Sequence, residues 1–451
     1  MGIKQQSIIF ISNCGETLPL AYRLKKMGVS CPVYLHNPGC KHLYDGLLNT
    51  KVDLKGLTKA LLGADLVVFD TIKRNEREKH DGALLKTFGL KANVKEIFGA
   101  VADKLKTDHK VFGGSEATGE IELDRFRGED LARKAGLLIP ETHRFKNLND
   151  GIKFLKGRKD LWVFKPHGNL DLDLTYVEKY PGDLLGKMEH EYKSRLGDSV
   201  EYIVQKVIDG VEISTEGWFD GKEWRCFNHT IEDKRLMNGN LGPAIGSQNN
   251  TVWLKKNPNG FLIPEFKKLT PFLKQSGYIG AIDINAIVSK EDKKPYFLEF
   301  TPRMGYDAFY CLMEMVKNPL IDFWTKDFNV DFHDGFASSE RVSIPPFPYA
   351  GDELLEDFAR DSIIKGRLDD YPQFWAEDVY VNENGKLACA GSDGIIGVMT
   401  ARGNNPGSSW GSVYRELNGL KVGNYLQFRT DGLKRAEKAL RTLKEWGINI
   451  E

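Results

Sequence analysis

Short apolar runs alternate with helix-spaced segments over roughly the first hundred residues, and this alternation restricts the folds open to the region. Apolar runs typical of buried strands occupy residues 7–12, 33–35, 64–70 and 111–114, and residues 18–27 carry apolar side chains at helical spacing before Gly28. Strands separated by helices indicate a parallel sheet with crossover helices. We therefore predict an α/β domain over residues 1–114.

After residue 115 the apolar runs follow one another more closely. We expect a helix at 129–135, strands at 161–164 and 202–207, a hairpin made by 215–219 and 223–227, and paired strands at 281–287 and 296–301. Such a series is typical of antiparallel sheet in an α+β region. This second domain is predicted to span residues 115–330.

The segment 331–351 contains His333-Asp334-Gly335 and Pro345-Pro346-Phe347-Pro348, which are typical of a linker. Beyond it we expect strands at 378–381 and 394–400 and a closing helix at 433–446. We predict a third, mixed α+β domain over residues 331–451. A chain of 451 residues has room for about three domains of ordinary size.

Composition restricts the function. The 63 Lys and Arg residues balance 63 Asp and Glu residues, which argues against direct binding to nucleic-acid phosphates. No stretch approaches the ~20 consecutive apolar residues of a membrane-spanning helix. The six cysteines include no Cys-x-x-Cys pair and are predicted to be reduced thiols of a cytoplasmic protein. We expect small-molecule substrates, no membrane, and a monomer or homodimer.

Polar side chains alternate along the paired strands at 281–301. Asp283 and Asn285 share one face of the first strand. On the second strand Glu299 and Thr301 share a face, and Leu298 and Phe300 are expected to be buried on the opposite face. Carboxylates and neutral oxygens are the ligands that Mg²⁺ prefers. The candidate metal ligands are Asp283, Glu299 and Thr301, and the pattern alone also allows a solvated polar face of a hairpin.

A lysine ends the apolar strand at 161–164. Lys165 precedes Pro166-His167-Gly168, so it is suitably placed to meet a phosphate as a point charge. The later segment 202–214 combines a strand, a short hinge, a Gly turn and Glu212. Of the nine histidines, His167 and His229 lie near this proposed site in the sequence, and both fit packed or hydrogen-bonded roles better than that of a base.

The order of these segments resembles the ATP-grasp fold, and residues 7–440 resemble the phosphoribosylamine–glycine ligases (glycinamide ribonucleotide synthetases). The similarity rests on five motifs: Glu232-Asp233-Lys234-Arg235, residues 238–246, Glu299-Phe300-Thr301-Pro302-Arg303-Met304-Gly305, residues 393–401 and Phe428-Arg429-Thr430-Asp431. The fold that it implies is an ATP-grasp domain, preceded by an N-terminal parallel α/β domain and followed by a mixed C-terminal domain.

The resemblance implies ATP and Mg²⁺ as cofactors, with Mn²⁺ as an alternative metal. The implied nucleotide-binding residues are Lys165 for the phosphates, the backbone of a hinge that includes Gln205, Lys206 and Val207 for adenine, and Glu212 for the ribose. The implied metal ligands are Glu299 and Thr301, to which the strand geometry adds Asp283. The implied catalytic residues are Lys234 and Arg235 on the acceptor side and Arg303 at the transferred phosphoryl group.

Three departures from the family pattern affect the expected substrate and site. The glycine-rich phosphate loop is replaced by 168–174, which has one glycine and two added acids. Thr301 replaces the metal-binding asparagine. The N-terminal motifs that seat phosphoribosylamine are replaced by 12–17 and 69–72, which predicts another acceptor.

The resemblance implies an ATP-dependent carboxylate–amine ligase that works through an acyl phosphate. We expect it to join an amino acid, with glycine as the first candidate, to an amine on a nucleotide- or sugar-like acceptor. One alternative is a catalytically weak ATP-binding sensor or scaffold of ligase ancestry. Another is a phosphotransferase that acts on a hydroxyl or carboxylate without forming an amide.

Overall fold

The computed structural model describes residues 6–166, 174–254, 260–349, 358–423 and 425–450. The chain forms two compact units, and each is built from separate segments. Unit 1 comprises Met1–Gly119, Ser214–Asp283 and Thr301–Glu451, and unit 2 comprises Glu120–Ile213 and Ile284–Phe300. The division into three consecutive domains remains a prediction.

The N-terminal part of unit 1 contains a five-stranded parallel sheet, as predicted. Its order is β3 (Lys51–Val52), β2 (Val33–Leu35), β1 (Ile8–Ser12), β4 (Leu66–Phe69) and β5 (Val111–Phe112). The sequence analysis missed β3, because two residues are too short to show a strand period. The carboxyl ends of all five strands lie along one edge of this sheet.

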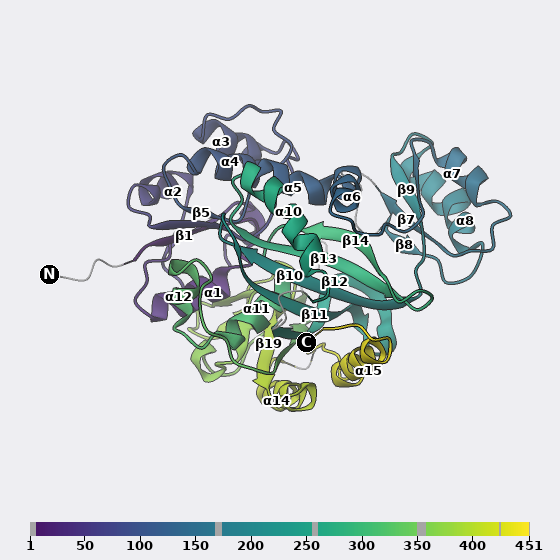
Figure 1. Cartoon of the computed structure of the whole chain (residues 1–451). Helices are drawn as coiled ribbons and strands as arrows, with labels where there is room; N and C mark the ends of the chain where they lie inside the picture. The colour runs from purple at the N-terminus through teal and green to yellow at the C-terminus, as the bar shows by residue number, and fades with distance from the viewer. Residues whose placement is uncertain (1–5, 167–173, 255–259, 350–357, 424, 451) are drawn as a thin grey trace. The chain divides into compact units, whose positions relative to one another are not determined.

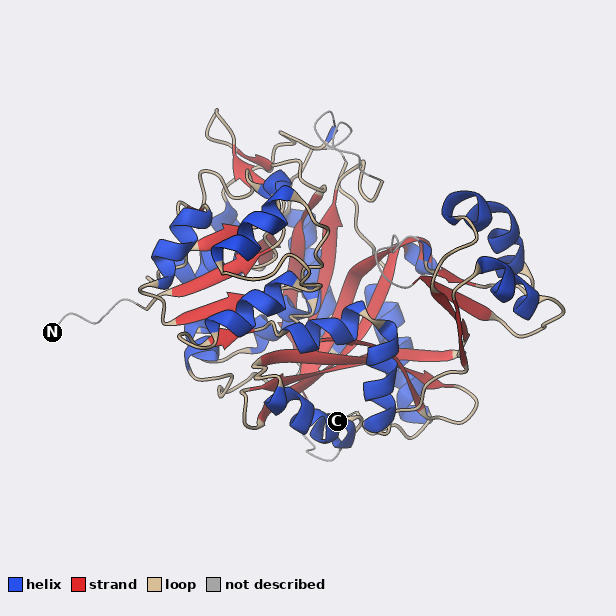
Figure 2. Ribbon diagram, turned by 90° about the horizontal axis from the view of Figure 1, so that it is seen from above, coloured by secondary structure: helices blue, strands red, loops and turns tan. Residues whose placement is uncertain are grey.

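Both faces of the parallel sheet are buried, which explains the unbroken apolar run of β1. Ile8 and Phe10 belong to one core cluster with residues of α1 (Leu18–Lys26). Ile9 and Ile11 belong to another, with residues of α2 (Leu54–Leu61), α3 (Lys79–Thr87) and α4 (Ile97–Leu105). Figure 2 shows helices in blue on both sides of these strands.

A larger antiparallel sheet supplies the strands on which most predicted site residues lie. Its order is β14 (Pro295–Thr301), β13 (Gly280–Ser289), β10 (Gly210–Phe219), β11 (Trp224–Met237), β12 (Leu241–Leu254), β15 (Phe336–Ser343), β19 (Ile395–Gly403) and β16 (Phe374–Ala376). The predicted hairpin is β10 and β11, and the predicted strands at 281–287 and 296–301 are β13 and β14.

The predicted linker at 331–351 is wrong, because Phe336–Ser343 forms β15 and pairs with β12 on one side and β19 on the other. The polar composition of this strand hid it from the sequence analysis. Its buried polar side chains are hydrogen-bonded: Gln248 Nε2 donates to Glu340 Oε1 at 2.7 Å, and the Arg341 guanidinium donates to Asp307.

Unit 2 contains a four-stranded antiparallel sheet in the order β6 (Thr142–Phe145), β9 (Tyr202–Lys206), β7 (Trp162–Pro166) and β8 (Tyr176–Val177). One face packs on α7 (Leu148–Leu155) and α8 (Asp183–Lys187), which Figure 1 labels beside the strands. Trp162 and Phe164 point into this core. Strand alternation therefore turns Lys165 to the opposite face.

Within the described residues, the two units also contain further α-helices and strands. They are α5 (Glu116–Leu123), α6 (Arg125–Lys134), α9 (Lys193–Leu196), α10 (Ile263–Gln275), α11 (Tyr306–Met315), α12 (Leu320–Thr325), β17 (Val379–Val381), β18 (Leu387–Cys389), α14 (Pro406–Gly419) and α15 (Gly432–Glu445). All six cysteines are free thiols. Among the described residues, no helix has the length and apolar character needed to cross a bilayer.

A buried ion pair holds β15 to α11 within unit 1. Arg341 Nη2 and Nε donate to the two carboxylate oxygens of Asp307 at 2.6 and 3.0 Å, and their side chains are 7% and 1% exposed. Arg341→Met leaves an unpaired buried carboxylate, which costs about 3–5 kcal/mol. We expect chemical denaturation to report a loss of this size. Adding Asp307→Leu should recover most of it, and a double variant no more stable than Arg341→Met would contradict the assignment.

Candidate functional site

Lys165 belongs to a side-chain network across unit 2. Its Nζ donates to Gln205 Oε1 on the neighbouring strand β9 at 2.8 Å. Gln205 is 3% exposed, and its Nε2 donates to Thr142 Oγ1 at 2.9 Å. The Gln205 amide therefore orients the lysine, a side-chain role that the sequence analysis did not foresee because it assigned this residue only backbone contacts.

Lys165 and Glu299 line one small hollow within unit 2, although they lie on strands far apart in the sequence. Arg125, Glu129 and Ile203 also line it. Arg125 Nη1 lies 4.0 Å from Glu299 Oε2, and the glutamate side chain is 44% exposed. The hollow thus combines two cationic groups with a reachable carboxylate, a set that suits a phosphate accompanied by a metal ion.

The burial of the hydrophobic residues around Glu299 departs from strict strand alternation. Phe297 and Phe300 are both buried and their rings are 4.6 Å apart, whereas Leu298 is half-buried and lines the hollow. The expected burial of Phe300 is confirmed and that of Leu298 is wrong. Arg125 was missed because the predicted helix began four residues later than α6 begins.

The amides of the predicted adenine hinge are partly engaged within unit 2. Lys206 N–H donates to Glu141 O at 2.8 Å, and Val207 N–H donates to Leu161 O at 2.9 Å. The Lys206 ammonium lies 3.3 Å from Asp160 Oδ1. Contact with a base would therefore use other backbone groups of the hinge. Glu212 is half-buried near the start of β10.

Unit 1 gathers carboxylates around Asp283. This residue is 7% exposed, and Ser214 Oγ donates to its Oδ1 at 2.6 Å. Burial raises the pKa of the Asp283 carboxyl well above its ordinary value, and the negative charges of Glu216 and Glu232 raise it further. Such a group gains most from a nearby cation, which would stabilise its ionised form.

The sequence analysis did not identify Glu216 as a site residue. The predicted hairpin strand began at residue 215, so it did not include Glu212 and Ser214, the residues with which Glu216 shares a face. The strand begins at Gly210, so alternation places Glu212, Ser214 and Glu216 on one face. Glu216 is 4% exposed, and its Oε1 accepts a hydrogen bond from Trp218 Nε1 at 2.8 Å. Burial raises the pKa of Glu216 to about 7.

Lys234 and Arg235 are adjacent on β11 and have different partners. Lys234 Nζ lies 3.7 Å from Glu232 Oε2, in the electrostatic environment of Asp283. Arg235 Nη1 donates to Gly242 O on β12 at 2.6 Å. The structure thus associates Lys234 with the acidic cluster, and gives Arg235 a contact that supports the irregular β11–β12 pairing.

Arg303 follows β14 after half-buried Thr301. Its guanidinium lies 4.2 Å from the centre of the Tyr306 ring, and its Nη1 donates to Met304 O at 3.4 Å. His229 fits its expected packed role, because it is fully buried and its Nδ1 lies 2.8 Å from Thr215 Oγ1. His167 and nearly all of the predicted loop at 168–174 lie outside the described residues.

The raised pKa of Glu216 predicts a pH-dependent stability difference. The folded protein holds this proton more tightly than the unfolded chain, so the group lowers the free energy of unfolding as pH rises from 4.5 to about 7. Glu216→Gln removes that penalty and keeps the acceptor for Trp218. In metal-free buffer, we expect the variant to gain on the order of 3 kcal/mol relative to wild type between pH 5 and pH 8. A pH-independent difference in denaturation would contradict this.

Comparison with known proteins supports the arrangement of these strands. No family model matches the chain. A phosphoribosylamine–glycine ligase of Clostridium acetobutylicum is 22% identical over 315 residues, which cover 63% of this chain and 72% of the relative. The solved phosphoribosylamine–glycine ligase of Thermotoga maritima matches with a TM-score of 0.67 and 15% identity, and covers 94% of this chain and 99% of its own.

A third similar protein is the biotin carboxylase domain of 2-oxoglutarate carboxylase from Hydrogenobacter thermophilus, solved with MgADP, ADP and bicarbonate. It matches with a TM-score of 0.59 and 12% identity, and the match covers 98% of each chain. The matches to the two solved structures extend over nearly the whole length of this chain, as the motif order does. The chain therefore has the ATP-grasp fold and resembles the phosphoribosylamine–glycine ligases.

Proposed function

We propose that the protein is an ATP-dependent, ADP-forming ligase that joins a carboxylate to an amine through an acyl phosphate. The observation that carries this proposal is the hollow in unit 2 that both Lys165 and Glu299 line. A lysine and a metal-binding carboxylate within reach of one phosphate group are the minimum for positioning a transferable phosphoryl group. ATP-grasp ligases are ADP-forming carbon–nitrogen ligases, and their reaction requires the phosphoryl transfer that this arrangement could support.

The oxygen groups of the chain fit Mg²⁺, with Mn²⁺ as an alternative. The proposed ligands are Glu299, Thr301 and Asp283, and the last is a carboxyl whose burial favours a bound cation. Asn285 lies two residues after Asp283 on the same face of β13. Its Oδ1 is buried and has no hydrogen-bond partner among the described residues. The metal would neutralise phosphate charge when bound.

The chain's own residues position the reactants and carry compensating charge. In unit 2, Lys165 contacts the phosphates while Gln205 fixes its direction, the hinge at 204–207 holds the base, and Glu212 binds the ribose. The substrate carboxylate attacks the γ-phosphorus and ADP leaves; an amine then attacks the acyl carbon, phosphate leaves, and the amine loses a proton. Arg303 steadies the phosphoryl group and Lys234, with Arg235, lines the acceptor side.

An acidic edge of the parallel sheet supports an acceptor other than phosphoribosylamine. Thr17 donates through its backbone N–H and Oγ1 to Asp70 Oδ2, at 3.1 and 2.9 Å. Burial, and next the charge of Glu16, raises the pKa of the Asp70 carboxyl. A phosphate at the ends of β1 and β4 would oppose the ionisation of the Asp70 carboxyl still further, so this edge disfavours a phosphate. An amino acid, with glycine first, remains the proposed carboxylate, and the proposed acceptor is a nucleotide- or sugar-like amine without a phosphate at this edge.

The proposal includes small-molecule substrates in the cytoplasm and a monomeric or homodimeric enzyme. These expectations rest on composition and on the resemblance. The alternative of an ATP-binding sensor or scaffold differs in one measurable respect, since it would bind ATP without releasing ADP.

Lys165→Met should weaken ATP binding by roughly 10- to 100-fold, because the variant loses a charge-assisted contact with phosphate. The measurement is calorimetric titration of full-length protein with MgATP. The matched control is Lys146→Met, which removes an exposed lysine of unit 2 that lies 3.4 Å from Glu201 and is 85% exposed. Equal loss in both variants, or no loss in Lys165→Met, would refute the phosphate contact.

Glu299→Gln should lower ADP release by roughly 10²- to 10³-fold through loss of charge stabilisation in the transition state. ADP is measured with MgATP, an amino-acid pool and a small-metabolite extract, and Glu201→Gln serves as the matched control. ADP release that needs both pools supports the ligase. Release that needs no amine favours a phosphotransferase, and ATP binding without any release favours the sensor.

A further inference from the structure

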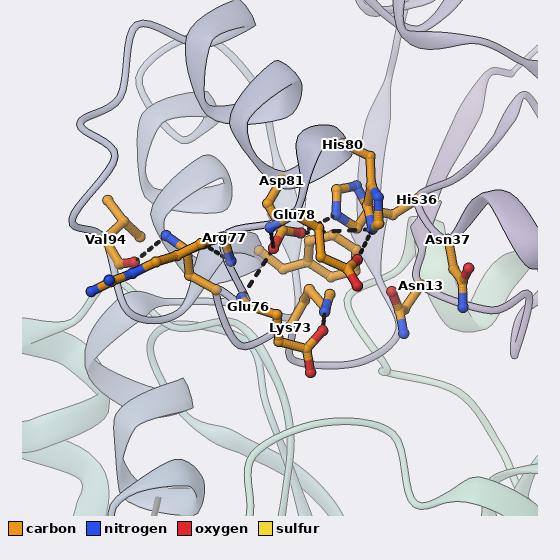
Figure 3. A network of polar contacts seen from close by, with 12 residues as sticks. Asn13, His36, Asn37, Lys73, Glu76, Arg77, Glu78, His80, Asp81 and Val94 are labelled. Atoms are coloured by element: carbon orange, nitrogen blue, oxygen red, sulfur yellow. Dashed lines mark hydrogen bonds and ion pairs between the residues drawn. The ribbon is translucent and has the colours of Figure 1, made fainter. Parts of the chain in front are cut away.

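A second group of metal-ligating side chains lies at the carboxyl edge of the parallel sheet, within unit 1. His36 directly follows β2, and His80 and Asp81 lie in the first turn of α3. One ligand atom from each lies within 4.8 Å of the others. Figure 3 shows these three side chains close together, with Glu78 beside His80. The nucleotide and metal sites proposed above use none of them.

The distances within this group approach those of a tetrahedral metal site. His36 Nε2 lies 2.8 Å from Asp81 Oδ1, and His80 Nε2 lies 3.9 Å from the same oxygen. Glu78 Oε2 lies 2.7 Å from His80 Nε2. Bonds of ~2.0–2.1 Å to a tetrahedral ion separate neighbouring ligand atoms by about 3.3 Å. The observed separations lie on both sides of this value, so small side-chain rotations would bring the ligand atoms to the spacing of a tetrahedral site.

Asp81 and His36 each use one side-chain atom for contacts outside the His36–His80–Asp81 group, and the other atom of each faces into the group. Asp81 Oδ2 accepts hydrogen bonds from the backbone N–H groups of Glu76 at 3.0 Å and Glu78 at 3.2 Å. This leaves Oδ1 to face both histidines. Tyr34 Oη lies 3.4 Å from His36 Nδ1, the ring nitrogen that does not contact Asp81. Outer contacts of this kind fix the orientation of metal ligands.

The segment that carries Glu78, His80 and Asp81 is held in place by hydrogen bonds of the Asn75 side chain and backbone. Asn75 Nδ2 donates to Ala92 O at 3.0 Å and Val94 O at 2.7 Å, and its N–H donates to Lys95 O at 2.8 Å. His36 and Asp81 are buried at 2% and 0% exposure. The His80 side chain is 24% and that of Glu78 52% exposed, which leaves a path for an ion to enter.

We propose that His36, His80 and Asp81, with Glu78 as fourth ligand, bind a divalent first-row transition metal ion of the zinc type. Two imidazoles with carboxylates suit Zn²⁺, whereas Mg²⁺ prefers oxygen ligands alone. The site therefore differs in kind from the proposed magnesium site. The bound ion joins the segment after β4 to the end of β2, beside the switch point between β1 and β4, where α/β sheets commonly bind their ligands.

The test is zinc binding by chelator-treated, full-length protein without nucleotide, measured by competition with a chromophoric chelator. We expect one Zn²⁺ per chain and a rise in melting temperature, because the ion binds the folded state. His80→Gln should weaken binding at least tenfold. The control is His143→Gln, which alters a histidine 2.8 Å from Glu141 in unit 2 and should bind zinc as the wild type does.

Cobalt substitution gives a second readout of the ligands. Co²⁺ at this site should produce visible bands of a tetrahedral nitrogen–oxygen site, and His80→Gln should abolish them. Thiolate-to-cobalt charge-transfer bands would assign the ion to cysteines and overturn the proposal. Absence of stoichiometric zinc binding, or equal binding by His80→Gln, would also overturn it. Circular dichroism and MgATP titration of His80→Gln establish that the variant is folded.

Discussion

The cost of burying carboxylates on β10 and β13 is the constraint on which the proposed chemistry of unit 1 depends. Strand alternation directs Glu212, Ser214 and Glu216 to one face of β10, and Ser214 contacts Asp283 on β13. Removal of Asp283 and Glu216 from water raises the pKa of both. Without a cation this arrangement penalises the ionised groups, and in the proposed function Mg²⁺ would offset that penalty.

In unit 2, neighbouring side chains fix the direction of a flexible lysine, Lys165. Trp162 and Phe164 anchor β7 in the core, so Lys165 must leave the opposite face. Gln205 then restricts the position of the Lys165 Nζ by accepting its hydrogen bond. The Gln205 amide is oriented in turn by its own hydrogen bond to Thr142. An ammonium on a four-carbon stem would otherwise lose considerable conformational entropy on binding a phosphate. For the proposed phosphate contact, the Lys165–Gln205–Thr142 network would reduce that entropy loss by ordering the lysine before the nucleotide binds.

Much of the fold could be predicted because its strands have clear periods: β1, β2, β4, β9, β13 and β14 all lie where apolar runs indicated them. Lys165 and Glu299 were predicted separately, and the structure brings them to one hollow. β15 could not be predicted, because Ser338, Ser339, Glu340 and Arg341 are polar residues buried by tertiary partners. Glu216 and the His36–His80–Asp81 group depend on strand limits and on contacts between distant segments, neither of which a local pattern contains.

The central claim is that a carboxylate is activated as an acyl phosphate, and oxygen transfer tests it most directly. The protein would be incubated with MgATP, the amine-containing extract and an amino-acid pool labelled with ¹⁸O in the carboxyl group. The released phosphate would then be analysed by mass spectrometry. Our account predicts one ¹⁸O atom in each phosphate, because the bond between the carboxyl carbon and the bridging oxygen breaks when the amine attacks. Release of ADP with unlabelled phosphate, or no release with any mixture, would contradict it.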